Sequence, residues 1–431
     1  MKKYSEKTKI ELSRIEFWGM VLLIVMLGIL LWSNTRQGEE PKLAVAQPGE
    51  LLQLIPSIVG LTQSSVENGN SVTVLENGAF FHSLLADIAK AQHTIHVESY
   101  VWWKGEICER VAAALAAKAR SGVEVRVLLD ASGSSRMDDK LFESMKAAGC
   151  HVAKFHPVRL GKLGRLNNRD HRKITVIDGR IGYIGGHGFA EEWTGNAQDK
   201  KHFRDTFLRT EGPIVNRLQG AFCENWIEET GEIPAGEKYY PKPQNAGNIP
   251  MHLAYSSPKG SVSSVQLLYY LAIVAAKHEL LIQNPYFLPD NDALDALIAA
   301  KKRGVDVQIM LPAATVNDSP LVQHASHHHF GTLLKHGIRI FEYQKTLLHQ
   351  KIMIVDGTWS CVGSTNFDDR SFKLNDEISV GIVDRGIAAQ LRQAWDADMK
   401  FCQERKFEEW KNRGLWHKLR DGLAYSTNSQ L

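Results

Sequence analysis

Two short segments of this chain carry the same three chemically active residues at the same spacing. Both read His-x-Lys-x4-Asp, and their members are His171, Lys173 and Asp178 in the first copy and His349, Lys351 and Asp356 in the second. Each copy is followed, at the same offset, by an apolar stretch and a turn of small residues, Gly185-Gly186 and then Gly363-Ser364. A single triplet arises by chance too easily to carry weight, but two with matching flanks indicate one active site built from two halves.

The side chains of the two triplets suit a reaction at phosphorus. Residues i and i+2 of a strand point to the same face, so each histidine and its lysine can address one ligand. Two ammonium groups neutralise phosphate oxygens, one imidazole attacks phosphorus and the other protonates the leaving oxygen, without any need for a metal. Asp178 and Asp356 follow at the turns, where each is expected to cap the turn or to pair with a base. The alternative for either histidine alone is a structural residue packed near a turn.

The elements that must position the triplets also occur twice. Apolar alternation predicts strands, each followed by a helical segment that ends in glycine and then by a second strand. These repeated elements are 93–102, 107–122 and 123–130 in the first half and 278–287, 293–304 and 305–312 in the second. The Asp-Gly dipeptide in each motif predicts a hairpin. The alternation predicts an α/β protein with helices on both faces of its sheet, present as a duplicated domain.

Size, charge and cysteine content limit the class of protein further. The 431 residues allow two domains, and a net charge of only +3 indicates that the chain as a whole does not bind polyanions. Five scattered cysteines without C-x-x-C spacing predict neither a disulfide framework nor a zinc site. A basic run leads into the first motif and is interpreted as an approach path for an anionic substrate, with a solvated loop as the alternative. Its members are Lys154, Arg159, Lys162, Arg165, Arg169, Arg172 and Lys173.

An apolar segment near the start of the chain predicts a membrane anchor. Residues 17–32 are uncharged and mostly apolar, with Trp18 and Trp32 near the ends, and extension to Asn34 brings the run to the ~17–25 residues of a span. A cleaved signal peptide is the alternative. The nearby basic residues are Lys2, Lys3, Lys7, Lys9 and Arg14 before the run and Arg36 and Lys42 after it. The excess of basic residues before the run predicts that the N-terminus lies in the cytoplasm and the body of the chain across the membrane.

The chain therefore divides into five predicted parts. These are a cytoplasmic segment 1–16, a transmembrane anchor 17–34, a linker 35–50, a first half 51–240 and a second half 241–431. The expected location is the cell membrane, with a single pass and the catalytic part on the non-cytoplasmic side.

The flanks of the two motifs resemble the bacterial cardiolipin synthases of the phospholipase D superfamily. The likeness extends from about residue 70 to about residue 401, and the segments that carry it are RDHRKITVIDGRIGYIGG, FRDTFLRTEGPIVNRLQGAFCENW, NPYFLPD, GVDVQIMLP, LLHQKIMIVDG and GSTNFDDRSFKLNDE. The resemblance implies a duplicated phospholipase D-type fold of two α/β/α halves with mixed sheets and one active site at their interface.

The resemblance also implies a membrane-bound phosphatidyltransferase that condenses two phosphatidylglycerols into cardiolipin and glycerol. His171 is assigned as the nucleophile that forms a phosphohistidine, and His349 as the acid and base. Attack by water would give phosphatidic acid, so a phospholipase D hydrolase is the alternative, followed by a nuclease. The expected partners are a phospholipid substrate and the membrane, with no nucleic acid, no cofactor and no catalytic metal.

Four further residues receive roles from the resemblance. Glu377 is expected to orient His349 and Asp205 to orient His171, since a carboxylate behind a histidine fixes its tautomer. Asn366 and Ser364 are the expected phosphate-binding residues. The family usually repeats the asparagine in both halves, but this chain has Gly188 in the first. Its neighbour His187 is a candidate substitute.

Two other segments are open to two interpretations. Four histidines near one another, at positions 324, 327, 328 and 329, have a spacing that could hold a metal, but the sequence offers no acidic partner nearby. A solvated helix face is the favoured interpretation. Residues 407–423 mix aromatic and basic side chains, which suits an interfacial helix, although packing on the domain is favoured.

Overall fold

The computed structural model describes residues 16–28, 42–47, 49–157, 167–257 and 262–425. The chain forms two compact units, Met1–Ala44 and Val45–Leu431. In the first unit, residues 16–28 are helical. Among the described helices, none combines the length and the apolar character that crossing a membrane requires. Residues 1–15, 29–34 of the expected anchor and 35–41 of the expected linker lie outside the described residues.

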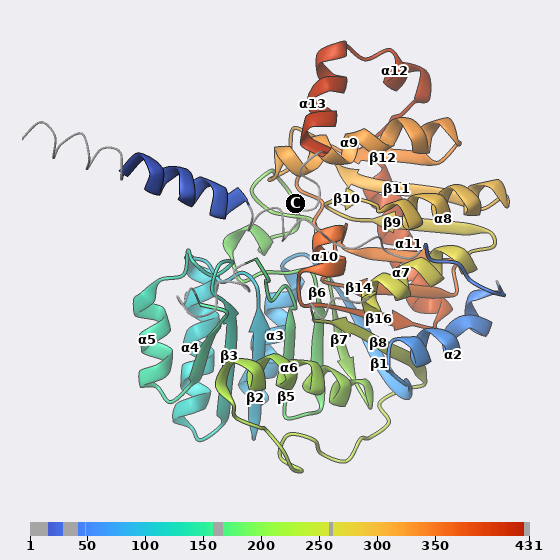
Figure 1. Ribbon diagram of the computed structural model, residues 1–431. Coiled ribbons are helices and arrows are strands. Elements are labelled where there is room, and N and C mark those ends of the chain that lie inside the picture. Colours follow the sequence, from blue (N-terminus) through green and yellow to red (C-terminus); the bar gives the residue numbers. More distant parts are fainter. Residues whose placement is uncertain (1–15, 29–41, 48, 158–166, 258–261, 426–431) are drawn as a thin grey trace, which may run out of the picture. The chain divides into compact units, whose positions relative to one another are not determined.

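The second unit contains one continuous sheet of 15 strands, in which the duplication is visible directly (Figure 1). The strand order is β4-β3-β2-β5-β6-β7-β1 in the first half and β8-β16-β14-β13-β9-β11-β12-β17 in the second. Apart from β17, each half repeats the order of the other. The halves are joined by antiparallel pairing of β1 with β8, so the two mixed sheets expected from the sequence form a single one.

The elements of the first half follow the predicted alternation. They are β1 (Val66–Glu76), α3 (Ala79–Lys90), β2 (Thr94–Ser99), α4 (Glu106–Arg120), β3 (Glu124–Asp130), α5 (Asp139–Ala147), β4 (His151–Phe155), β5 (Ile174–Ile177), β6 (Ile181–Gly185), a 3-10 turn η2 (Glu191–Trp193), β7 (Thr206–Glu211) and α6 (Ile214–Thr230). Parallel pairing of β2, β3 and β4 requires helical crossovers, which α4 and α5 supply.

The second half repeats these elements and adds several. They are β8 (Ile249–Ser256), α7 (Ser264–Ala275), β9 (Glu279–Gln283), β10 (Phe287–Leu288), α8 (Asn291–Lys302), β11 (Asp306–Pro312), α9 (Pro320–Lys335), β12 (Arg339–Tyr343), β13 (Ile352–Val355), β14 (Trp359–Gly363), β15 (Phe367–Asp368), α10 (Asp369–Lys373), β16 (Glu377–Ile382) and α11 (Arg385–Met399). The C-terminal additions are β17 (Cys402–Arg405), α12 (Phe407–Lys411) and α13 (Leu415–Tyr425).

The motif segments form the two predicted hairpins, β5–β6 and β13–β14. At both turns the Asp and the Gly have positive φ, +54° and +61° at Asp178-Gly179 and +50° and +60° at Asp356-Gly357. Two consecutive residues in the left-handed region are characteristic of the type I′ turn, whose twist matches that of the flanking strands.

Helices cover both faces of the sheet, as predicted. In the first half α3, α4 and α5 pack on one face, and in the second half α7, α8 and α9 do the same. Apolar residues of α6 and α11 share a core with the central strands of both halves. Because the central strands are covered on both sides, β5, β13 and β16 are buried along their whole length.

Two peripheral helices pack on the second half. Helix α2 (Leu51–Leu61) falls within the range expected for the first half, yet its buried residues join the core of α7. Helix α13 packs on α9, with Asp421 and Ala424 buried, which confirms the favoured interpretation of the C-terminal segment. Trp416 and Leu423 of the same helix remain exposed.

Candidate active site

The two motif histidines line a single cavity to which both halves contribute. Its volume is about 310 Å³. The lining residues are Tyr100, Val101, Trp103, Arg169, His171, Lys173, Trp193 and Phe203 from the first half and Tyr286, Asp318, Ser319, Val322, His349, Asn366, Arg370 and Asn375 from the second. The fold therefore brings together two histidines that lie far apart in the sequence.

Short backbone pairings hold each histidine segment against the other half. The His171 N–H donates to the carbonyl oxygen of Asp376 at 2.9 Å. By the same geometry the His349 N–H donates to the carbonyl oxygen of Arg204 at 2.8 Å. In each half, the segment before the motif hairpin therefore pairs with a segment of the other half, the one just before β16 or the one just before β7.

The residue after each of these acceptors is a carboxylate that meets the histidine of the other half. Glu377 Oε1 lies 2.9 Å from His171 Nδ1, and Asp205 Oδ2 lies 2.7 Å from His349 Nδ1. The pairing expected from the resemblance, Glu377 with His349 and Asp205 with His171, is therefore wrong. The cause is the crossing of the backbone segments, which places each carboxylate in the opposite half-site.

The two lysines are buried beneath the histidines. Lys173 Nζ donates to the carbonyl oxygen of His171 at 2.6 Å, and Lys351 Nζ donates to that of His349 at 2.7 Å. Lys351 Nζ also lies 3.1 Å from both ring nitrogens of His349. Burial lowers the pKa of Lys173 to about 7 and that of Lys351 to about 8, because desolvation disfavours the charged ammonium.

The surroundings of the two carboxylates shift their pKa values in opposite directions. Burial raises the pKa of Glu377 to about 7, although Lys173 and the hydroxyl of Ser364 favour its charged form. Burial also acts to raise the pKa of Asp205, but His187, His349 and Lys351 outweigh it, so the pKa of Asp205 is lowered. The site therefore holds one carboxylate that stays ionised and one that exchanges a proton near neutrality.

Both imidazoles are held in the neutral form in this cavity. Burial, followed by the charge of Lys351, lowers the pKa of His349 to about 4. Burial together with Lys173 and Lys351 lowers the pKa of His171 well below its usual value. Since Nδ1 of each ring faces a carboxylate, Nε2 is the nitrogen that remains for a substrate.

Comparison with known proteins decides the family. The family model described as "Cardiolipin synthase, PLD-like domain" matches residues 84–217 and 270–399. This chain belongs to the cardiolipin synthase family of phospholipase D-like proteins. The resemblance seen in the sequence is thereby confirmed, and with it the class of phosphatidyltransferases.

Individual relatives agree with the family model. Cardiolipin synthase 2 of Staphylococcus epidermidis is 35% identical over 359 residues, which is 82% of this chain and 73% of the relative. The major cardiolipin synthase of Bacillus subtilis is 35% identical over 362 residues, 82% of this chain and 74% of the relative. The solved structure of a phosphatidylserine synthase from Haemophilus influenzae superposes with a TM-score of 0.67 at 13% identity, covering 87% of this chain and 99% of that one. At that identity the likeness concerns the fold alone.

The aspartates of the family motif lie at the hairpin turns, away from the cavity lining. The carboxylate of Asp178 accepts hydrogen bonds from the N–H groups of Gln92, His93 and Thr94 at 2.7–2.8 Å. The carboxylate of Asp356 accepts them from Lys277, His278 and Glu279 at 2.7–3.0 Å. Each aspartate therefore ties its hairpin turn to the start of the neighbouring strand, in agreement with the expected capping role, and neither one lines the cavity.

Of the two residues expected to bind phosphate, Asn366 and Ser364, only one lines the cavity. Asn366 lines the cavity, and its Oδ1 is buried without a hydrogen-bond partner among the described residues. Ser364 instead donates its hydroxyl to Glu377, so it supports the carboxylate and does not line the cavity.

At the corresponding position the first half has Gly188, which provides no side chain. A Cβ at Gly188 would lie 2.7 Å from Cβ of Val101, so no side chain fits there without displacement. His187 is buried beside the carbonyl oxygen of Asn77, at 2.9 Å from its Nε2, and is not among the cavity-lining residues. The suggestion that His187 replaces the asparagine is therefore wrong.

The basic run before the first motif divides in the structure. Arg169 and Lys173 line the cavity, which agrees with an approach path for an anion. Arg172 is fully buried and turns away to donate to Glu224 and to the carbonyl oxygen of Ala221. Residues 159, 162 and 165 lie outside the described residues.

Several site residues were not identified from the sequence. The ring of Tyr100 lies edge-on to His171 with centroids 5.0 Å apart, and Trp193 lies edge-on to His349 at 5.3 Å. Trp193 Nε1 also donates to Asp205 Oδ2 at 2.9 Å. Arg370 adds a second guanidinium to the cavity and donates to Asn167 Oδ1 at 3.0 Å. The usable signal was the position of Tyr100 just past β2, since ligand sites in α/β proteins lie at the carboxyl ends of parallel strands.

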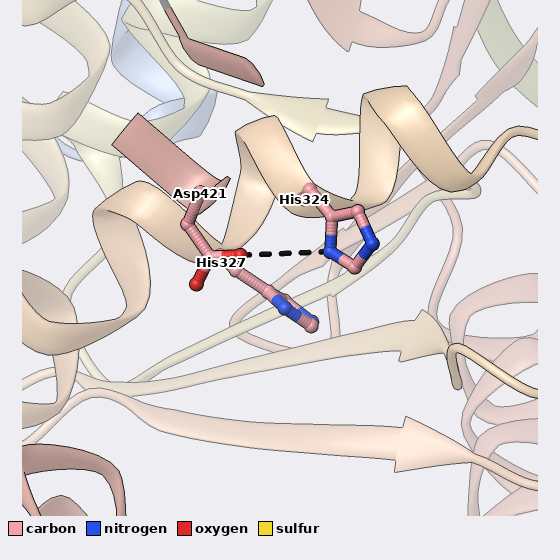
Figure 2. Close-up of side chains that lie close together, drawn as sticks. All are labelled: His324, His327 and Asp421. Carbon is pink, nitrogen blue, oxygen red and sulfur yellow. Dashed lines mark ion pairs between the residues drawn. The ribbon is translucent and has the colours of Figure 1, made fainter. Parts of the chain in front are cut away.

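The histidine cluster on α9 is not a solvated face. His327 and His329 are buried, and Asp421 of α13 approaches His324 in Figure 2. The acidic partner that the sequence did not offer is almost a hundred residues away along the chain but adjacent in space. The favoured interpretation of this cluster was wrong for that reason.

Proposed function

We propose that this protein makes cardiolipin by transferring the phosphatidyl group of one phosphatidylglycerol to the glycerol hydroxyl of a second. The observation that carries the proposal is the pair of imidazoles on one cavity, each with Nδ1 tied to a buried carboxylate and Nε2 left for chemistry. One nitrogen serves the phosphorus and the other the leaving or entering oxygen, as double displacement requires.

The reaction proceeds in two displacements. In the first, His171 Nε2 attacks phosphorus, the bond from phosphorus to the glycerol oxygen breaks, and His349 gives that oxygen a proton. Glycerol leaves and a phosphohistidine remains. In the second, His349 takes the proton from a glycerol hydroxyl of another phosphatidylglycerol, whose oxygen attacks phosphorus. The phosphorus–nitrogen bond breaks, cardiolipin leaves and both histidines return to their initial state.

The difference between the carboxylates supports His171 as the nucleophile. Asp205 stays ionised and stabilises a cationic His349, which is what a proton donor needs. Glu377 shares a proton near neutrality and stabilises a cation on His171 less, so that imidazole remains an unprotonated nucleophile. His349 takes up its proton from solvent when the anionic phosphodiester binds, because the negative charge of the substrate raises the pKa of a nearby imidazole.

Positive groups in the cavity suit a phosphodiester. Lys173, Arg169 and Arg370 line it, and Asn366 adds an amide whose Nδ2 can donate to a phosphate oxygen. Cations and amide donors aimed at the phosphate oxygens stabilise the charge that develops in the transition state.

An apolar surface beside the cavity favours a lipid over a nucleic acid. Leu321, Trp416 and Leu423 are 49%, 83% and 73% exposed and line a groove of about 520 Å³, to which the polar side chains of His324, His417 and Arg420 also contribute. Val322, the next residue of α9, lines the active-site cavity. An exposed apolar groove on the helix that also contributes Val322 to the cavity supports a lipid substrate, because acyl chains need such side chains and a nucleic acid does not.

Membrane attachment through residues 17–34 belongs to the same proposal. The helical residues Phe17, Trp18, Leu22 and Leu23 are all more than half exposed, which leaves apolar side chains for contact with lipid. The excess of basic residues before this segment supports a single pass with the second unit on the non-cytoplasmic side of the cell membrane.

The proposal is tested by product analysis of the full chain in detergent. Purified protein is incubated with phosphatidylglycerol, and the products are identified by mass spectrometry, with His171→Ala and His349→Ala as matched controls. Cardiolipin together with glycerol supports the synthase. Phosphatidic acid as the sole product identifies the hydrolase, and cleavage of single-stranded DNA without lipid turnover contradicts the lipid function.

A further inference from the structure

We infer that His324, His327 and Asp421 form a binding site for a zinc-type transition metal that joins α13 to α9. One ligand atom from each of the three residues lies within 4.8 Å of the other two. Figure 2 shows the two imidazoles, one turn apart on α9, and the carboxylate of α13 gathered at one place. This cluster is separate from the histidines of the catalytic cavity and takes no part in the proposed transfer.

The distance between two of these ligand atoms fits two ligands of one metal ion better than a hydrogen bond between the two side chains. His324 Nδ1 and Asp421 Oδ1 are 3.5 Å apart, which is long for a hydrogen bond of about 2.7–3.0 Å between such groups. Two ligands at about 2.0–2.2 Å from one tetrahedral zinc ion are separated by about 3.3–3.6 Å. Both atoms are buried and have no hydrogen-bond partner among the described residues, and the Asp421 side chain is only 2% exposed.

One further polar atom of His327 and one of Asp421 are already held by neighbours. His327 Nε2 lies 3.2 Å from Glu342 Oε1, and Glu342 Oε2 accepts from Arg405 Nε at 2.9 Å. Asp421 Oδ2 accepts from Arg413 Nη2 at 3.0 Å. Metal-binding histidines usually donate their second ring nitrogen to a carboxylate in this way, which leaves Nδ1 of His327 for the metal.

The charged groups around the cluster are of both signs. Arg413 and Arg420, the latter 3.8 Å from Asp421 Oδ1, oppose a cation, whereas Glu342 offsets part of their charge.

The donor set indicates the class of metal. Two imidazole nitrogens and one carboxylate oxygen suit Zn²⁺, whose fourth position a water molecule would fill, whereas Mg²⁺ and Ca²⁺ prefer oxygen ligands alone. The first residues of α9, Ser319 at its cap and Val322, line the catalytic cavity. A metal that joins α13 to α9 is therefore expected to stabilise one wall of that cavity without touching the substrate.

Zinc titration of the full chain tests this inference. Protein prepared without a polyhistidine tag is stripped with a chelator, titrated with ZnCl₂ by calorimetry and followed by thermal unfolding. We expect one zinc ion per chain and a higher Tm with Zn²⁺ but not with Mg²⁺. His324→Ala and Asp421→Asn should each weaken zinc binding by more than about 10-fold, because even the loss of an outer partner costs that much.

The matched control is His336→Ala, which removes an exposed histidine at the C-terminal end of the same helix. It should bind zinc as the wild type does. The inference is overturned if the wild type shows no saturable zinc binding, or if His324→Ala binds as tightly as the wild type. His324 is 19% exposed, so its replacement leaves a folded protein to measure even if Asp421→Asn does not fold.

Discussion

Glu377 of the second half and His171 of the first are partners across the centre of the molecule, with Oε1 of the carboxylate 2.9 Å from Nδ1 of the imidazole. Asp205 and His349 form the reciprocal pair at 2.7 Å. Neither half-site is complete alone, because each imidazole takes its orientation from the other half. The duplication thus obliges the two halves to act as one catalytic unit.

This crossed arrangement predicts which histidine each carboxylate affects. With phosphatidyl-p-nitrophenol, whose leaving group needs no proton, Asp205→Asn should keep a rapid release of nitrophenolate, because the histidine that Asp205 contacts is His349 and not the nucleophile. Glu377→Gln should slow that release by about 10²–10⁴-fold because it leaves the nucleophile His171 misoriented. Stopped-flow absorbance measures both. A slow release in Asp205→Asn with a normal one in Glu377→Gln would contradict the assigned pairing of roles.

The same substrate distinguishes the two histidines themselves. His349→Ala should release one equivalent of nitrophenolate and then stop, because the phosphohistidine on His171 forms but its breakdown lacks a base. His171→Ala should release none above the background rate. Intact-protein mass spectrometry after acid-free quenching detects the phosphatidylated chain. A burst in His171→Ala, and none in His349→Ala, would assign the nucleophile to His349.

The sequence predicts the repeated elements well and the contacts between them poorly. The hairpins of Asp178 and Asp356 follow from local turn chemistry, since Asp-Gly favours two consecutive residues with positive φ. The partner of His171 depends instead on a bridge between Asp170 and Asp376, which pairs segments far apart in the sequence. The approach of Asp421 to His324 has the same origin, because only the packing of α13 on α9 creates it.

Replacing a motif aspartate should affect stability more than chemistry. Asp356→Ala removes three N–H···O bonds to residues 277–279 and should lower the free energy of unfolding by about 2 kcal/mol or more. Because Asp356 does not line the cavity, kcat per folded molecule should change by less than about 10-fold. Chemical denaturation and steady-state cardiolipin formation check the two expectations. A large fall in kcat at unchanged stability would show that Asp356 acts in catalysis.

The asparagine present in only one half predicts an asymmetric response to substitution. Asn366→Ala should lower kcat by about 10²-fold, in the range expected for the loss of one transition-state hydrogen bond donated by the side-chain Nδ2. Gly188→Asn should not add a second donor, because its Cβ would lie 2.7 Å from Val101 Cβ, and it should lower Tm. Higher activity in Gly188→Asn would show that the first half-site has room for the missing amide.

The buried lysines predict that activity falls with rising pH, and that this fall begins at a pH well below the usual pKa of a lysine. Burial lowers the pKa of Lys173 to about 7 and that of Lys351 to about 8, so in the free enzyme both charges are lost as the pH rises through this range. Attraction of the anionic phosphate weakens accordingly, and kcat/KM for phosphatidylglycerol should decline above about pH 8. Measurements of kcat/KM between pH 6 and pH 10 test this decline.

Lys351→Arg is the control variant, because a guanidinium keeps its charge throughout this range. Where it retains activity, its decline should begin at higher pH than in the wild type. A wild-type profile that stays flat to pH 10 would mean that both ammonium groups keep their protons in the cavity, against the effect of their burial.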